Sequence, residues 1–417
     1  MRIVVIGSGL MGVTTAYYLC CRGHQVTVID RQAGPGREAS FANGSLLTPS
    51  MAEPWNSPGC WRELLGSLGR SNAALQLNVR ALPPLANWGI RFLWNSRSAT
   101  FERNALSNLR LALHSLQAMK SLRQQTGIEY GRRALGALKI FRDHRSLDKT
   151  LATLQRRLVD GVNFRRLSPQ ELVGVEPALA PIAHQLTGAI HYEADETGDA
   201  YRFCVALADH VRQQGVEFRH STEVLSLETR SNRITAVIGE RDQFVADRYI
   251  VAAGSRSRAL LRQAGISLPV QPAKGYSVTV DGNAGDDALR IPIIDDQWHA
   301  AIVPLDGSIR VAGTAEFAGY DESPNPDRIR NLTSLLQRVL PNAQYDPATA
   351  RPWCGLRAMS ADGVPIIGAT PVSNLMVNTG HGHLGWTMAA GSSQLLSELI
   401  CGASPSIDPR PYSLARF

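Results

Sequence analysis

Residues 1–30 read MRIVVIGSGLMGVTTAYYLCCRGHQVTVID, and this stretch decides the fold. Its first apolar run, Ile3–Ile6, predicts a buried parallel strand. A helical pattern follows and stops near Gly23, and a second apolar run, Val26–Ile29, predicts another strand that ends on Asp30. The order strand, helix, strand is typical of a βαβ unit, so we expect a doubly wound, Rossmann-type sheet.

Gly7, Gly9 and Gly12 supply the spacing G-x-G-x-x-G between the first strand and the helix. The first glycine allows a tight turn, the second lets the backbone approach a pyrophosphate, and the third lets the helix pack on the strand. The helix N-terminus then presents free N–H groups to the phosphates. Asp30 follows Gly12 by 18 residues, at the place where a carboxylate takes ribose hydroxyls. The pattern predicts an adenine dinucleotide; the alternative is a glycine-rich turn in an ordinary βαβ unit.

The composition is that of a globular protein of about two domains. The chain has 417 residues, of which 44% are hydrophobic and 19% charged, with a formal net charge of +7. The basic residues are scattered, so we expect no nucleic-acid partner, and the excess charge favours anionic ligands or a phospholipid surface. We expect no signal peptide, transmembrane helix, disulfide or metal site, and a cytoplasmic location.

Segments of the cofactor-binding type recur at the start, middle and end of the chain. We therefore expect an α/β protein with a discontinuous Rossmann-type domain and a mixed-sheet α+β substrate domain built from the insertions. The predicted division assigns three segments, 1–80, 146–268 and 346–417, to the cofactor domain. It assigns 81–145 and 269–345 to the substrate domain.

Several further stretches carry a resemblance that runs nearly from end to end. They are ETGDAYRFCVAL (196–207), YIVAAG (249–254), AKGYSVTV (273–280), RVAGTAEFAGY (310–320), CGLRAMSADGVPIIG (354–368) and NTGHGHLGWT (378–387). Together with the opening motif they resemble the FAD-dependent amine oxidoreductases typified by D-amino acid oxidase, glycine oxidase and sarcosine oxidase. Within that group the chain is most similar to the bacterial D-amino acid dehydrogenases.

The resemblance implies that FAD is the cofactor, held by the opening motif, by the loop after the second strand and by the turn before the last helix. That turn, at 380–385, would direct helix N–H groups toward the flavin; the alternative is that its glycines only make a tight turn. The cofactor residues predicted beside Gly7, Gly9, Gly12 and Asp30 are Ser8, Leu10, Met11, Arg31, Ser40, Asn43, Gly44, Ser45, Leu46, Val224, Ala253, Gly254, Gly380, His381, Gly382, His383, Leu384, Gly385, Trp386 and Thr387.

Two residues are predicted to bind substrate. Arg357 would hold an amino-acid carboxylate through two parallel hydrogen bonds, unless it is an ordinary surface arginine. Tyr276, on a predicted strand, would add a second bond to the carboxylate or else pack in the core. Cys354 lies close to Arg357, and we expect a packed thiol there rather than a covalent link to the flavin.

The resemblance implies oxidative deamination of a D-amino acid to a 2-oxo acid and ammonia, with electrons passed to a quinone or another acceptor. Alternatives are an enzyme of cyclic or secondary amino acids, such as D-proline, hydroxy-D-proline, glycine or sarcosine, and a non-catalytic flavin subunit. Trp55, Trp61, Trp88 and Trp94 are interleaved with arginines, a pattern that suits a peripheral contact with the inner face of the cell membrane. Packing in the second domain is the other interpretation.

Overall fold

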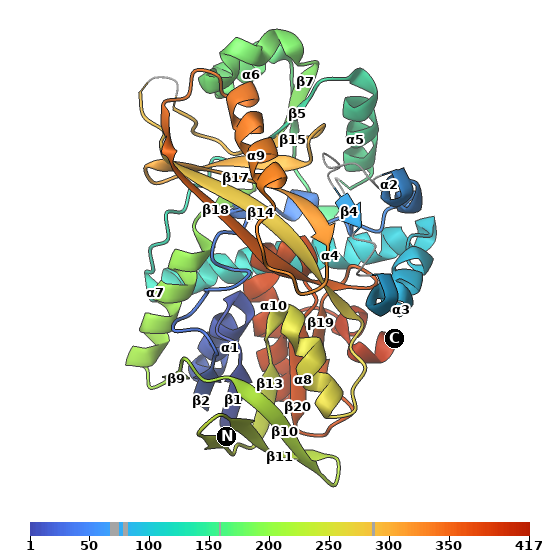
Figure 1. The fold of residues 1–417 in the computed structure, drawn as a ribbon, viewed down its shortest axis with the longest axis vertical. Coiled ribbons are helices and arrows are strands. Elements are labelled where there is room, and N and C mark those ends of the chain that lie inside the picture. Colours follow the sequence, from blue (N-terminus) through green and yellow to red (C-terminus); the bar gives the residue numbers. More distant parts are fainter. Residues whose placement is uncertain (67–74, 78–81, 158–159, 286–287) are drawn as a thin grey trace.

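The computed structural model of the chain describes residues 1–66, 75–77, 82–157, 160–285 and 288–417. It is elongated and carries one large sheet toward each end, as Figure 1 shows. The sheet nearer the N-terminus holds the opening motif. From one edge to the other its strands are β19 (Ile366–Ala369), β20 (Leu375–Thr379), β13 (Arg248–Val251), β1 (Arg2–Ile6), β2 (Gln25–Ile29) and β9 (Glu217–Arg219).

This six-stranded sheet is parallel apart from the pair β19–β20. Strands from the start, middle and end of the chain are neighbours in it, since β13 and β20 follow β1 across the sheet. The predicted discontinuous Rossmann-type arrangement is therefore confirmed. The apolar runs are buried on both faces, as a parallel sheet between two layers requires.

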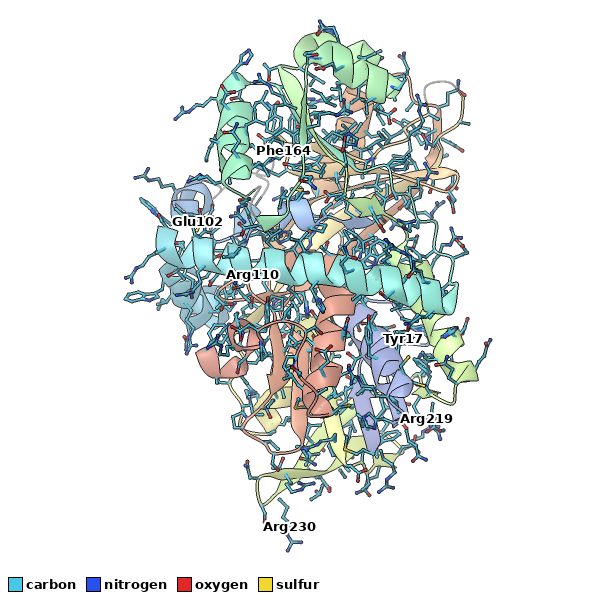
Figure 2. The ribbon with its side chains drawn as sticks, turned by 180° about the vertical axis from the view of Figure 1, so that it is seen from behind. Tyr17, Glu102, Arg110, Phe164, Arg219 and Arg230 are labelled. Atoms are coloured by element: carbon cyan, nitrogen blue, oxygen red, sulfur yellow. The ribbon has the colours of Figure 1, made fainter. Side chains whose placement is uncertain are left out.

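Helices cover one face of this sheet, and a small sheet with one helix covers the other. The first layer holds α1 (Leu10–Cys21), α10 (Gly385–Ile400) and α7 (Ala200–Gln213). The second holds β10 (Val224–Arg230), β11 (Arg233–Gly239), β12 (Gln243–Phe244) and α8 (Ser257–Gln263). Seen from behind, α4 (Ser98–Thr126) crosses the middle of the molecule over α10, with the exposed side chain of Arg110 on it (Figure 2).

The second large sheet is mixed. Its main path runs through β18 (Tyr345–Ser360), β14 (Val270–Gly282), β17 (Ser308–Phe317), β16 (Ala300–Leu305), β15 (Ile293–Asp295), β5 (Ala137–Phe141), β7 (Gly188–Tyr192) and β6 (Arg165–Leu167), and β4 (Leu75–Leu77) pairs with β17. One face packs on α9 (Pro326–Val339) and α6 (Pro169–Val175). The other face turns toward the first sheet, with α5 (His144–Arg157), α2 (Cys60–Gly66) and α3 (Leu82–Trp94) beside it (Figure 1).

The boundaries of the predicted domains differ from the boundaries of these sheets. β6 and β7 fall in the segment 146–268, which was assigned to the cofactor domain, but they pair with β5 in the mixed sheet. All of β18 except its first residue falls in 346–417, yet most of the strand pairs with β14. The predicted boundary between 80 and 81 lies outside the described residues. We propose that the cofactor domain excludes 146–192 and 346–360.

Candidate active site

A cavity of about 1610 Å³ lies between the two sheets. The carboxyl ends of β1, β2 and β13 line one part of it, and the inner face of the mixed sheet lines the other. A site for one drug-sized ligand measures roughly 300–1,000 Å³. The cavity therefore has room for a dinucleotide together with a second small molecule.

The glycines of the opening motif form a cradle that no larger residue could form. Gly7 has a φ of +108°, and a Cβ there would lie 2.5 Å from the carbonyl oxygen of Ala252. A Cβ on Gly12 would lie 1.7 Å from the carbonyl oxygen of Gly7. Gly9, the N-cap of α1, has no side chain that could cap the helix. The Ser40 hydroxyl accepts a hydrogen bond from the N–H of Leu10 at 3.2 Å, and the other N–H groups at this helix N-terminus are the ones that suit a phosphate.

Asp30 lies at the end of β2, as predicted, but its carboxylate is already engaged. Oδ2 accepts hydrogen bonds from the backbone N–H of Ser8 at 2.6 Å and from its hydroxyl at 2.7 Å. Oδ1 accepts a hydrogen bond from the N–H of Gln32 at 2.8 Å. A carboxylate has about four acceptor positions, so Asp30 can fix the glycine loop and still receive a ribose hydroxyl.

Most residues predicted to hold the cofactor line this cavity. Those that do are Gly7, Gly9, Leu10, Met11, Asp30, Arg31, Ser40, Asn43, Gly44, Ser45, Leu46, Val224, Ala253, Gly254, His381, Gly382, His383, Gly385 and Trp386. Ser8, Gly12, Gly380, Leu384 and Thr387 lie behind this lining. Arg31 also forms an ion pair with Glu38 at 2.5 Å.

The cradle, the open helix end and the acid at the end of β2 together fit an adenine dinucleotide. The turn at 380–385 fits less directly, because its residues Gly382–Leu384 form a short 3₁₀ helix ahead of α10. Arg357 and the ring systems beside it occupy the part of the cavity next to that turn.

Arg357 projects from β18 into the cavity, and none of the described acidic side chains forms an ion pair with it. Its Nη1 donates one hydrogen bond, at 3.2 Å, to the carbonyl oxygen of Thr314. Its guanidinium carbon lies 5.5 Å from the centre of the Trp55 ring. Burial lowers the pKa of Arg357 to about 10, and no acidic side chain among the described residues offsets that effect. A desolvated cation with free N–H groups is a site for an anion, best filled by a planar carboxylate.

Gly275 makes room for this guanidinium. The residue pairs with Gly355 across β14 and β18, and a Cβ on it would lie 2.1 Å from Nη1 of Arg357. The arginine side chain therefore lies directly over the backbone of β14. Glycine is required at position 275 because the Arg357 side chain, called the clamp below, packs on it; the strand itself would accept a larger residue.

Tyr276 does not face the substrate side, so the prediction that it binds the carboxylate is wrong. Successive side chains of a strand point to opposite faces, and Gly275 already faces the cavity. The Tyr276 side chain is 1% exposed in the core beneath α9. Its hydroxyl donates to Oε2 of Glu316 at 2.7 Å. Cys354 packs against the same core and donates from Sγ to the carbonyl of Glu322 at 2.7 Å.

The two histidines of the turn at 380–385 are neutral at pH 7. Burial lowers the pKa of His381 to about 3, and its Nε2 lies 2.9 Å from the hydroxyl of Ser392. Burial, and then the charge of Arg357, lower the pKa of His383 to about 4. The His383 ring stacks on Trp55, with centroids 5.1 Å apart and planes at 16°. Neither histidine competes with Arg357 for an anion.

Trp55 is a site residue that sequence reasoning missed, because the tryptophan pattern suggested a membrane or core role. It belongs to the cavity wall formed by 48–57. Two hydrogen bonds hold this segment: the N–H of Thr48 donates to Oγ1 of Thr387 at 3.0 Å, and the Ser50 hydroxyl donates to Asp195 at 2.5 Å. The signal that could have included it is that this segment directly follows the loop predicted after the second strand.

Comparison with known proteins identifies the family to which this chain belongs. The family model described as FAD dependent oxidoreductase matches residues 2–399. A D-amino acid dehydrogenase from Vibrio vulnificus is 39% identical over 420 residues, covering 100% of both chains. One from Paramagnetospirillum magneticum is 40% identical over 420 residues, covering 100% of this chain and 99% of its own.

Solved structures share the fold at lower identity. Glycine oxidase from Geobacillus kaustophilus superimposes with a TM-score of 0.78 at 22% identity, covering 100% of this chain and 99% of its own. L-proline dehydrogenase from P. horikoshii gives a TM-score of 0.77 at 20% identity, covering 100% and 98%. At these identities the likeness concerns the fold alone.

We predict that Gly275→Ala will disable the clamp without disturbing the dinucleotide site. The new methyl group would occupy the place of the guanidinium, so the affinity of the FAD-loaded protein for propionate should fall about a hundredfold, as expected when a buried charge pair is broken. The measurement is the change in flavin absorbance on titration with propionate.

Arg357→Ala should cause a similar loss, and the double variant should be no worse than either, because the two changes remove one interaction. Additive losses in the double variant, or unchanged affinity in Gly275→Ala, would contradict this assignment.

Proposed function

This chain belongs to the family of FAD-dependent oxidoreductases, and we propose that it oxidises D-amino acids to 2-oxo acids and ammonia. The observation that carries the proposal is Arg357, a desolvated cation in the cavity with no acidic partner among the described residues. The D configuration rests on the relatives named D-amino acid dehydrogenase, which align with the chain over its full length. We propose the cavity-lining residues given above as the FAD site and Arg357 as the substrate clamp.

FAD, when bound, supplies a two-electron acceptor for the hydride that leaves Cα of the amino acid. The resulting imine takes up water and gives the 2-oxo acid and ammonia. Arg357 binds the carboxylate through two N–H groups and so fixes the direction in which Cα points. Trp55 supports the guanidinium from its ring face. A non-catalytic flavin subunit would have no need of this clamp.

The neutral histidines limit what the site does with protons. With pKa values of about 3 and 4, His381 and His383 are poor acceptors for an ammonium proton. We infer that the amino acid reacts from its neutral-amine form and that these histidines serve as packing and hydrogen-bonding groups. Hydride transfer needs an unprotonated nitrogen lone pair, so the rate of flavin reduction should rise with pH as the substrate amine loses its proton.

The test is anaerobic mixing of the FAD-loaded protein with D- and L-amino acids while the flavin absorbance is followed. D-Alanine should bleach the flavin, L-alanine should not, and Arg357→Ala should remain yellow and unreduced at the same D-alanine concentration. D-Proline, glycine and sarcosine, tested in parallel, distinguish a cyclic or secondary amine substrate. Reduction by L-alanine alone, or full activity of Arg357→Ala, would refute the proposal.

We further propose a quinone as electron acceptor and a peripheral contact with phospholipid through α2 and α3. The four tryptophans considered above divide into two pairs. Trp55 lines the cavity, and Trp88 is buried, with Nε1 donating to the carbonyl of Met359 at 3.1 Å. Trp61 and Trp94 are 47% and 62% exposed. In the described ranges, no helix is both long and apolar enough to cross a bilayer.

The proposed contact patch consists of the exposed apolar and basic side chains on α2 and α3, together with Arg97. Ile90 and Leu93 are also exposed on α3, at 69% and 42%. The guanidinium of Arg97 lies 3.5 Å from the centre of the Trp94 ring, and Arg62 lies over Trp61. Apolar side chains bordered by arginines match the interface of an anionic membrane.

We predict that the protein will sediment with vesicles that contain phosphatidylglycerol and less with vesicles of phosphatidylcholine alone. Ile90→Ser/Trp94→Ser should reduce the bound fraction several-fold, because it removes the apolar anchor. Val245→Ser, which removes an exposed apolar side chain from outside this patch, is the matched control. The proposed membrane contact would be contradicted if the Ile90→Ser/Trp94→Ser and Val245→Ser variants bound vesicles to the same extent. It would also be contradicted if the bound fraction did not change with salt concentration.

A further inference from the structure

Between its first and last pairs with β14, the strand β17 contains one residue without a partner on that strand. Gly275 pairs with Ala315 and Tyr276 pairs with Gly313, so Thr314 is the extra residue of a β-bulge. The neighbouring pairing between β16 and β17 ends at Ala300 and Gly313. Thr314 therefore lies outside both ladders, and its backbone is free to point elsewhere.

Thr314 has an unfavourable conformation by two measures. Its φ is +54°, in the left-handed region where a β-branched residue is a genuine outlier. Its hydroxyl oxygen is buried without a hydrogen-bond partner in the described structure. Such strain persists only where the surroundings fix the residue, and it collects at functional sites.

The conformation places the Thr314 carbonyl on the clamp. That oxygen accepts the hydrogen bond from Nη1 of Arg357 at 3.2 Å. On the neighbouring strand, Gly275 leaves no side chain between the guanidinium and β14. Trp55 lies under the same group. The guanidinium is thus held by three neutral groups: the carbonyl of Thr314 on β17, the backbone of β14 at Gly275, and the ring of Trp55.

We propose that the strained bulge at Thr314 is a positioning device that fixes the Arg357 guanidinium for a substrate carboxylate. The carbonyl occupies one N–H group and leaves the others directed at the cavity. The carbonyl is a neutral acceptor, so it orients the cation without neutralising it. An aspartate or glutamate in its place would neutralise the charge. The identity of the anion rests on the proposed function, but the role of the bulge does not.

The experiment compares Thr314→Gly with wild type in the FAD-loaded protein. Glycine adopts a positive φ without steric cost but also leaves it freely, so the carbonyl loses its fixed direction. We expect the dissociation constant for propionate to rise about fivefold. This is part of the loss expected when a hydrogen bond to a charged group is removed altogether. The melting temperature should stay the same or rise, because the strain at Thr314 is relieved.

Two controls make the result specific. Thr314→Asn introduces a side chain that tolerates the left-handed region, and it should keep the propionate affinity within about twofold of wild type. Ser231→Gly relieves a φ of +48° in the turn between β10 and β11, far from the clamp in sequence, and should leave the affinity unchanged. Weaker binding without lower stability separates positioning from a merely structural role.

The outcomes distinguish this inference from the proposed function. If wild type binds propionate and Thr314→Gly binds it equally well, the positioning role is refuted while the clamp stands. If Thr314→Gly weakens binding but melts at a much lower temperature, the residue is structural and the inference is also refuted. If wild type is not reduced by D-alanine yet Thr314→Gly still weakens propionate binding, the proposed function fails and the positioning role stands.

Discussion

The partly buried guanidinium of Arg357 is the constraint on which the rest of the site depends. Placing a cation in a cavity wall without an acid beside it is unfavourable, because the charge loses water and gains little in return. Within the part of the chain that the structure describes, the fold meets this constraint with neutral groups: the Thr314 carbonyl, the Trp55 ring and the strand backbone at Gly275. Each of these holds the cation in place and none removes its charge, so the attraction for a carboxylate is retained.

The two sheets make this arrangement possible. The parallel sheet brings the ends of β1, β2 and β13 together around the glycine cradle. The mixed sheet presents a face that is bare where the clamp lies, since Gly275 and Gly355 are paired on adjacent strands there. The opposite face of that sheet carries the polar network of Lys274, Tyr276 and Glu316 toward α9. The cavity next to the dinucleotide site exists because small residues lie on the face of the sheet toward the cavity and large residues lie on the face toward α9.

The sequence was most informative where local geometry and chemistry coincide. The opening motif predicted β1, α1 and β2 because glycine spacing, strand length and the acid at Asp30 all follow from one backbone path. The helix capped by Asp199 was likewise predictable, since its carboxylate accepts from the N–H groups of Tyr201 and Arg202. Tyr276 shows the limit of such reasoning: its strand was predicted, but which face it occupies depends on a register that only pairing with β17 and β18 sets.

Other features had no local signal. The loop predicted after the second strand contains β3 (Leu46–Leu47), which exists only because β8 (Glu196–Thr197) lies beside it. Trp55 reaches the site through contacts with His383 and Arg357, which are distant in sequence. The bulge at Thr314 is likewise invisible in the chain, because threonine is an ordinary strand residue and its positive φ arises from tertiary packing.

The most direct test of the account is a crystal structure of the FAD-loaded protein with propionate bound. Both carboxylate oxygens should lie about 3 Å from guanidinium nitrogens of Arg357, with Nη1 still bonded to the Thr314 carbonyl. A propionate bound elsewhere in the cavity, or an Arg357 side chain paired with an acidic residue of the protein, would contradict it.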